Sequence, residues 1–257
     1  VFSHGHQGYA ENSSFLMEHL ASHGWLVLAP DHTDNTLLDG SNRETAIYWE
    51  RPADISAVID EAAAIHAVTD QIVVIGHSFG GYTAHALGGA TYAIDDLLPA
   101  CLDGTDTSDF CSTMDETQAD RFRGGLADPR IRAVVAMAPG DFRLFGADGI
   151  AAIDRPELLM TGGHDGSSTS DGDPAWAALD GADDVRAHLP IAGHQAFTDF
   201  SGLVGDPPDS IDPEEGWRIV RTLALAFVEL HGRGDDAGLE LLDGSIVVSD
   251  QVELSAE

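Results

Sequence analysis

Short apolar runs alternate with longer amphipathic stretches along most of the 257-residue chain. The runs are rich in β-branched residues and are bounded by Gly, Pro or Asp, which predicts strands at residues 1–3, 25–29, 72–75, 131–138, 157–161 and 185–189. The stretches with apolar residues three and four positions apart predict helices at residues 13–23, 52–66, 81–87, 174–179 and 213–231. This alternation favours an α/β fold, in which helices cover both faces of a mostly parallel sheet.

Two segments depart from the alternation. Residues 91–130 are rich in acidic residues and poor in apolar ones, which predicts an excursion or lid over the carboxyl-terminal edge of the sheet. Residues 233–257 are polar and weakly patterned, and they predict a short helix followed by a loose extension. We therefore expect one domain over residues 1–232.

Pro52 is expected to begin the helix predicted at residues 52–66, because proline is favoured in the first turn of a helix.

The run at 72–75 leads into Gly76-His77-Ser78-Phe79-Gly80, and a predicted helix follows. A serine between a strand and a helix, with glycine two positions away on either side, is typical of a nucleophile elbow. The turn is tight enough to require residues without a Cβ at Gly76 and Gly80. The sequence therefore predicts Ser78 as a nucleophile.

A serine nucleophile needs a histidine that accepts its proton and an acidic residue that orients the histidine. In this setting the acid and then the histidine follow the serine in the chain, on loops after late strands. His194 follows the last predicted strand before residue 213, and Asp165 follows the strand before that one. Asp141 follows the preceding strand and is the alternative acid. We expect these residues to meet Ser78 at the carboxyl-terminal edge of the sheet.

Acyl transfer also needs two N–H groups directed at the oxyanion that forms during the reaction. The N–H of Phe79, directly after the nucleophile, is one expected donor. The other is expected from the glycine-containing loop at residues 3–8, with His6 as the first choice and Gln7 as the second. Gln7 and Tyr9 are also expected to contact the substrate.

Acidic residues outnumber basic ones by 44 to 12, the formal net charge is −32, and every basic residue is arginine. Nucleic acid and anionic lipid are not expected as partners, because binding to either depends on clusters of Lys and Arg. No apolar run is long enough to span a membrane. The acidic surface fits either adaptation to high salt or a merely acidic composition. We expect the protein to be a monomer. We also expect that, in the whole protein, further strands of the sheet precede residues 1–3.

Cys101 and Cys111 are the only cysteines, and they lie in a polar, aspartate-rich segment. Free structural cysteines are usually buried among apolar residues, so a disulfide is favoured here, and two free thiols are the alternative. A disulfide would favour a secreted or periplasmic protein.

Two groups of residues have the composition of metal sites, but each has a simpler interpretation, and neither metal nor cofactor is expected. His4 and His6 are spaced like zinc ligands, but the aspartate-histidine pair that such sites need does not follow. Three aspartates could ligate calcium through their carboxylate oxygens, although a solvated acidic loop is the favoured interpretation: Asp103, Asp106 and Asp109.

Several motifs together resemble one group of esterases. They are His4-Gly5 after a strand, residues 20–27 followed by Pro30-Asp31-His32, Gly76 to Gly81, and Gly193-His194-Gln195 with Phe197, Asp199 and Phe200. This set resembles the bacterial dienelactone-hydrolase-like esterases and the platelet-activating-factor acetylhydrolases, and more distantly the cutinase-like polyester hydrolases. The resemblance implies an α/β-hydrolase fold and hydrolysis of carboxylic esters without a cofactor.

The combined prediction is a serine carboxylesterase with Ser78, Asp165 and His194 as its triad. Its substrate is expected to be a small-molecule or polymeric ester. One alternative is a hydrolase of polyesters or of platelet-activating-factor-type phospholipids, and another is a binding module without catalytic activity.

Overall fold

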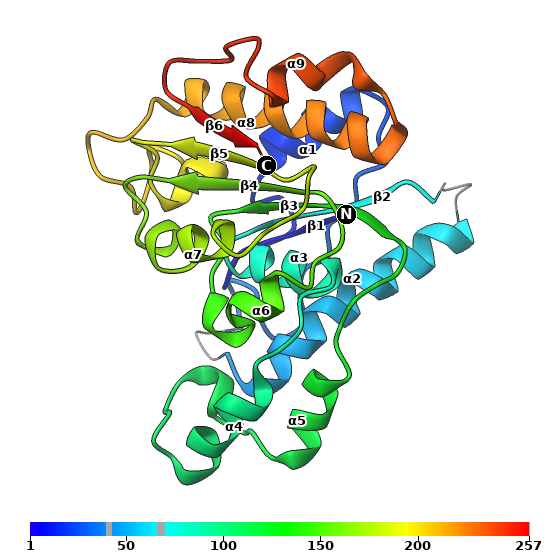
Figure 1. The fold of residues 1–257 in the computed structure, drawn as a ribbon, viewed down its shortest axis with the longest axis vertical. Helices are drawn as coiled ribbons and strands as arrows, with labels where there is room; N and C mark the ends of the chain where they lie inside the picture. Colours follow the sequence, from blue (N-terminus) through cyan, green and yellow to red (C-terminus); the bar gives the residue numbers. More distant parts are fainter. Residues whose placement is uncertain (40–42, 66–69, 257) are drawn as a thin grey trace.

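The computed structural model describes residues 1–39, 43–65 and 70–256, and residue 66 of the predicted helix at 52–66 lies outside this part. One six-stranded sheet forms the centre (Figure 1), and its strands lie side by side in chain order. The strands are β1 Phe2–Ser3, β2 Ile72–His77, β3 Ile131–Met137, β4 Glu157–Gly162, β5 Val185–Leu189 and β6 Glu253–Ala256. The first five are parallel, and β6 is antiparallel to β5. The loops after β1 to β5 therefore share one edge.

Helices cover both faces of the sheet, as the alternating pattern predicts. The helices are α1 Ser14–Ser22, α2 Thr45–Ile65, α3 Phe79–Gly88, α4 Ile94–Asp103, α5 Glu116–Arg123, α6 Gly146–Ile150, α7 Asp173–Trp176, α8 Pro213–Val228 and α9 Leu239–Leu242. Helices α1, α8 and α9 pack on one face, whereas α2, α3, α6 and α7 pack on the other (Figure 1). The predicted α/β fold class is confirmed.

The alternation of side chains along β2 explains the two cores. Val73 and Ile75 are buried in the core under α1 and α8, whereas Val74 lies in the core under α2 and α3. Each such buried side chain stabilises the fold by about 1.5–3 kcal/mol. All ten residues of α3 are buried, so the helix that follows Ser78 has a fixed place in the molecule.

The start of α2 differs from the prediction. Pro52 lies in the third turn, because the helix begins at Thr45. A proline inside a helix has no N–H for the carbonyl four residues earlier, which here is Tyr48 O. The hydroxyl of Tyr82 donates to that carbonyl at 2.7 Å. A residue from another helix thus replaces the missing bond, and the sequence pattern could not show this.

Residues 25–29 were predicted as a strand, and that prediction is wrong. The segment runs beside β1, where the N–H of Phe2 donates to Leu28 O at 2.8 Å. The described residues 25–29 form no strand, because β1 has only two residues and cannot support a ladder along five.

The loose extension expected at 233–257 is wrong in part. It does contain the short helix α9, but Glu253–Ala256 form β6 at the edge of the sheet. Three of the four β6 residues are exposed. An edge strand with so little burial does not need the alternating apolar pattern by which strands are recognised.

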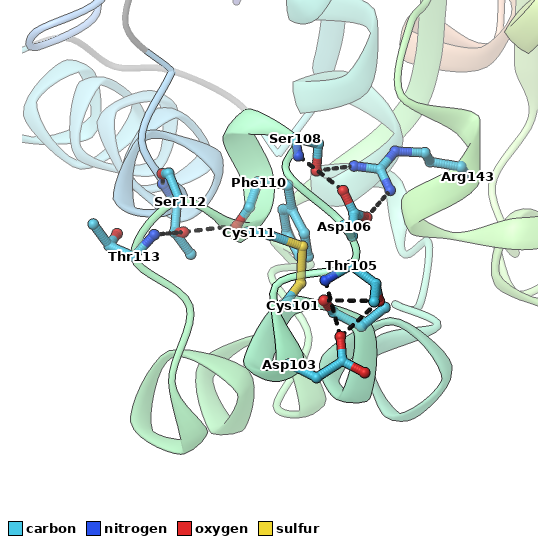
Figure 2. Close-up of a disulfide and its surroundings, with 12 residues drawn as sticks. Cys101, Asp103, Thr105, Asp106, Ser108, Phe110, Cys111, Ser112, Thr113 and Arg143 are labelled. Atoms are coloured by element: carbon cyan, nitrogen blue, oxygen red, sulfur yellow. Dashed lines mark hydrogen bonds and ion pairs between the residues drawn. A yellow bond between two sulfur atoms is a disulfide. The ribbon is translucent and has the colours of Figure 1, made fainter.

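Residues 91–130 form α4, α5 and a 3-10 turn at Asp109–Cys111, and they lie at one end of the molecule (Figure 1). Phe110 packs edge-on against Tyr48 of α2, with 5.2 Å between the ring centroids. Cys101 and Cys111 form a disulfide, as the composition of the segment favours (Figure 2).

Candidate active site

The turn at Ser78 has the backbone of a nucleophile elbow. Ser78 lies between β2 and α3 with φ 57° and ψ −117°, a conformation that L-residues rarely adopt. A Cβ at Gly76 would lie 1.9 Å from Gly80 O, and a Cβ at Gly80 would lie 1.9 Å from Ser3 O. Only glycine fits at either position. The surrounding backbone thus holds Ser78 in a strained conformation, which costs about 1–3 kcal/mol.

Ser78, His194 and Asp165 lie in hydrogen-bond contact. His194 Nε2 is 2.9 Å from Ser78 Oγ, and His194 Nδ1 is 3.0 Å from Asp165 Oδ1. An ionised carboxylate only accepts hydrogen bonds, so Nδ1 carries the proton and Nε2 accepts from the serine hydroxyl. This tautomer is the one that general-base catalysis by His194 requires.

The Asp165 carboxylate is held by the loop after β4. Its Oδ2 accepts from the N–H and the hydroxyl of Ser168 at 3.0 and 2.7 Å, and Oδ1 accepts from the N–H of Ser167 at 3.0 Å. Burial acts to raise the pKa of Asp165, but the bonds from His194, Ser168 and Ser167 outweigh burial and lower it. Asp165 is therefore ionised and fixed in orientation at neutral pH.

The alternative acid, Asp141, has a different partner. It follows β3 in a left-handed conformation, φ 63°, and accepts a hydrogen bond from Arg43 Nη1 at 3.1 Å. Burial raises its pKa, against the opposing effect of Arg43. The geometry therefore joins His194 to Asp165 and places Asp141 in an ion pair.

His77, which the sequence analysis did not single out, supports His194. Its ring is buried, and Nε2–H donates to the backbone carbonyl of His194 at 2.9 Å. Burial lowers the pKa of His77 to about 3, so the ring is neutral at neutral pH. The signal in the sequence was its place next to Ser78 in the elbow, which the structure brings into contact with the loop after β5.

The loop at residues 3–8 presents the second predicted N–H donor. Gly5 O accepts from His4 Nδ1–H at 2.7 Å and from the N–H of Gly8 at 3.1 Å. Because N–H and C=O point in opposite directions in a trans peptide, the N–H of His6 points away from these two donors. Phe79 is the first residue of α3, where backbone N–H groups have no acceptor within the helix. Phe79 directly follows Ser78, and His6 lines the same pocket as Ser78.

A pocket of about 240 Å³ opens at Ser78 and His194. His6 and Gln7 contribute to its wall, and Phe200 and Val204 make part of it apolar. Gln7 therefore lies where the sequence predicted. Tyr9 is not among the residues that line the pocket, but its ring packs edge-on against Phe200, which does, at 5.9 Å between centroids.

The histidines of the loop do not fit a zinc site. His4 is fully buried, its Nδ1 donates to Gly5 O, and its Nε2 accepts from the N–H of His32 at 3.1 Å. His6 Nδ1 accepts from Asn35 Nδ2 at 3.0 Å. With these nitrogens in hydrogen bonds, the pair cannot act as the metal ligands that their spacing suggested.

The acidic segment does not fit a calcium site either. Asp103 accepts from Thr105, and Asp106 accepts from Ser108 and pairs with Arg143 (Figure 2). Asp109 is 3.6 Å from Arg43. Asp106 also lies near Cys101 and Cys111, but both sulfurs are in the disulfide and cannot bind a metal.

Within the described ranges, the structure contains no helix that could cross a lipid bilayer. The family model of chlorophyllase matches residues 1–118, which include the loop at 3–8 and the elbow. A search of curated protein sequences found no match.

A solved structure, the ferulic acid esterase from Streptomyces cinnamoneus, superposes with a TM-score of 0.68 at 21% identity, over 98% of this chain and 72% of that one. With its mostly parallel sheet and the strand–turn–helix at Ser78, the chain has the α/β-hydrolase fold.

Proposed function

We propose that the chain is a serine carboxylesterase that works through an acyl-enzyme intermediate. The observation that carries the proposal is the continuous hydrogen-bonded arrangement Ser78–His194–Asp165, with heavy-atom distances of 2.9 and 3.0 Å, at the wall of a pocket. The esterase-type family model and structural match are consistent with it.

In the proposed reaction, Ser78 Oγ attacks the ester carbonyl carbon while His194 Nε2 takes the hydroxyl proton. The N–H groups of Phe79 and His6 bind the oxyanion of the tetrahedral intermediate. The alcohol then leaves with the proton from His194, and Ser78 remains acylated. Water attacks the acyl-enzyme, His194 accepts its proton, and the acid leaves as Ser78 regains a proton. Asp165 keeps His194 in the required tautomer throughout.

Hydrolysis of short p-nitrophenyl esters and labelling by a fluorophosphonate test this proposal. We expect turnover, one covalent adduct on Ser78 by mass spectrometry, and loss of both in Ser78→Ala. Dialysis against a chelator should leave turnover unchanged, because no step uses a metal. An adduct on another serine, or a folded protein with neither turnover nor label, would contradict the proposal and favour a binding module.

One observation favours large apolar or polymeric esters as a second candidate substrate class. Leu203 and Val204 are 76% and 57% exposed, and Val204 lines the pocket. Gly8 also lines the pocket, and its O accepts from the N–H of Leu37 at 3.1 Å; Leu37 and Leu38 are 64% and 92% exposed. Exposed apolar side chains around a pocket suit an apolar ligand.

Hydrolysis of a polyester film, compared with p-nitrophenyl acetate, tests this second candidate. The double variant Leu38→Ser/Leu203→Ser should lose activity on the film and keep it on the soluble ester, because neither residue is among those that line the pocket at Ser78 and His194. If the double variant loses the same fraction of activity on both substrates, these exposed leucines have no role in binding the polymer.

The disulfide between Cys101 and Cys111 is compatible with a secreted or periplasmic protein. We propose such an oxidising compartment for the enzyme.

A further inference from the structure

Arg51 of α2 is a fully buried cation without a carboxylate partner. Its side chain is 0% exposed, and among the residues that the structure describes no acidic side chain forms an ion pair with it. Burial lowers its pKa to about 9, so the guanidinium is still charged at neutral pH. A buried charge is strongly unfavourable unless hydrogen bonds replace its hydration. The groups that Arg51 binds therefore indicate why it is there.

Part of this network holds the loop at residues 3–8. Nη2 donates to His4 O and, at 3.1 Å, to Ser3 Oγ, while Nη1 donates to Asn35 Oδ1 at 2.7 Å. Asn35 is itself buried, and its Nδ2 donates to His6 Nδ1 at 3.0 Å. Arg51 thus fixes the backbone before His6 directly, and it fixes the His6 side chain through Asn35.

The rest of the network holds the start of α3. Arg51 Nε donates to Thr83 Oγ1 at 3.2 Å, and Thr83 Oγ1 donates to Phe79 O at 3.0 Å. The guanidinium carbon lies 4.7 Å from the centroid of the Phe79 ring. One side chain therefore contacts both the loop that carries His6 and the helix that begins at Phe79.

We propose that Arg51 is a positioning residue that sets the spacing of the two oxyanion donors, the N–H groups of His6 and Phe79. This inference rests on the proposed esterase function. A guanidinium suits the task because its donors form a rigid planar fork that can bind several carbonyl and hydroxyl oxygens at once. An oxyanion site works only if its donors are in place before charge develops on the substrate.

The test compares Arg51→Met, which keeps the length of the side chain, with the parent enzyme. We expect kcat for p-nitrophenyl acetate to fall about 10- to 100-fold, with KM changed less than about threefold, because the oxyanion exists only after the substrate is bound. Affinity for a trifluoromethyl ketone, which forms a tetrahedral adduct with Ser78, should fall by the same factor as kcat/KM. Arg51→Lys, which keeps the charge without the fork, should recover only part of the loss.

If Arg51→Met does not fold, the same kinetic measurements on Asn35→Ala and Thr83→Val test the proposal. Each removes one acceptor of Arg51, and each should lower kcat about three- to tenfold with the same small change in KM. The double variant Arg51→Met/Asn35→Ala should lose less than the product of the single losses, because both act through one network.

Ile55→Ala is the matched control, since Ile55 is buried one turn further along α2 and lies in the core under that helix. It should lower the Tm and leave kcat unchanged. A folded Arg51→Met enzyme with parental kcat, a loss confined to KM, or an equal loss of kcat in Ile55→Ala would overturn the inference. Absence of phosphonate labelling in the parent would instead overturn the esterase function and the inference with it.

Discussion

Two groups of residues at the edge of the sheet that carries Ser78 each contain a largely buried carboxylate after a strand. The His194 side consists of His194, Asp165 and His77, and the Arg43 side consists of Arg43, Asp141 and Asp109. On the His194 side, Asp165 accepts only from uncharged N–H and O–H groups and from the imidazole. On the Arg43 side, a guanidinium lies between two carboxylates, 3.1 Å from Asp141 and 3.6 Å from Asp109.

The two carboxyl groups respond to these surroundings in opposite directions. Hydrogen bonds lower the pKa of Asp165 against the effect of burial, whereas burial raises the pKa of Asp141 against the effect of Arg43. A position after a strand at this edge is therefore not enough to make an acid suitable for a triad. The residue that each carboxylate binds decides whether it can belong to the triad. Of the two, only Asp165 is in contact with His194, the histidine that is bonded to Ser78.

Replacement of each aspartate by asparagine should separate the two sides most strongly. Asp165→Asn should lower kcat about 10³- to 10⁴-fold, because an amide can stabilise the wrong tautomer of His194. Asp141→Asn should stay within about tenfold of the parent. Steady-state kinetics on a p-nitrophenyl ester measures both. If Asp141→Asn is the inactive variant and Asp165→Asn is active, the acid has been assigned to the wrong side.

Removal of the support under His194 should have the next largest effect. His77→Leu eliminates the donor to the His194 carbonyl and should lower kcat about 10- to 100-fold, because small displacements of a catalytic group are costly. His77→Gln keeps an N–H donor and should recover part of the loss. An equal loss in the two variants would show that the volume of the ring, rather than its hydrogen bond, is what matters.

The Arg43 side should affect stability more than turnover. Arg43→Met leaves the largely buried Asp141 carboxylate without its cation, and the free energy of unfolding should fall by about 1–3 kcal/mol, while kcat stays within about fivefold. Denaturant unfolding measures the first quantity. Arg132→Met is the control, because its ion pair with Asp70 is exposed and should contribute less than about 1 kcal/mol. A loss of activity like that of Asp165→Asn would place Arg43 in the catalytic machinery.

The smallest expected effect is a difference in the pH dependence of stability. The pKa of Asp165 is below its usual 3.8 in the folded state, so its stabilising contribution is present above pH 3.8 and is lost as the pH falls further. The pKa of Asp141 is above 3.8, so its carboxylate opposes folding at neutral pH and protonation relieves this cost.

Unfolding measured from pH 7 to pH 3 at constant high salt checks these signs. On acidification below pH 4, the stability of the parent should approach that of Asp165→Asn, because the contribution of Asp165 disappears. As Asp141 becomes protonated, the parent should gain stability relative to Asp141→Asn. Parallel curves for all three proteins would contradict the opposite pKa shifts.

The features that the sequence predicted correctly depend on local patterns. Strands β2 to β5 and helix α1 follow from apolar periodicity. The turn at Ser78 follows from two glycines where the backbone leaves no room for a Cβ. The chain order of serine, acid and histidine predicted Ser78, Asp165 and His194, and the structure places these three in contact.

The sequence by itself thus determined strands β2 to β5 and the elbow with Ser78, because neighbours along the chain decide these features, and it predicted His194 from the order of the chain. The tertiary structure alone decided that Pro52 lies inside α2, since Tyr82 supplies the missing hydrogen bond from another helix. It also decided between Asp165 and Asp141, and it placed Arg51 between the loop at residues 3–8 and α3. These outcomes depend on contacts between residues distant in sequence, whose hydrogen bonds and desolvation are established only when the chain has folded.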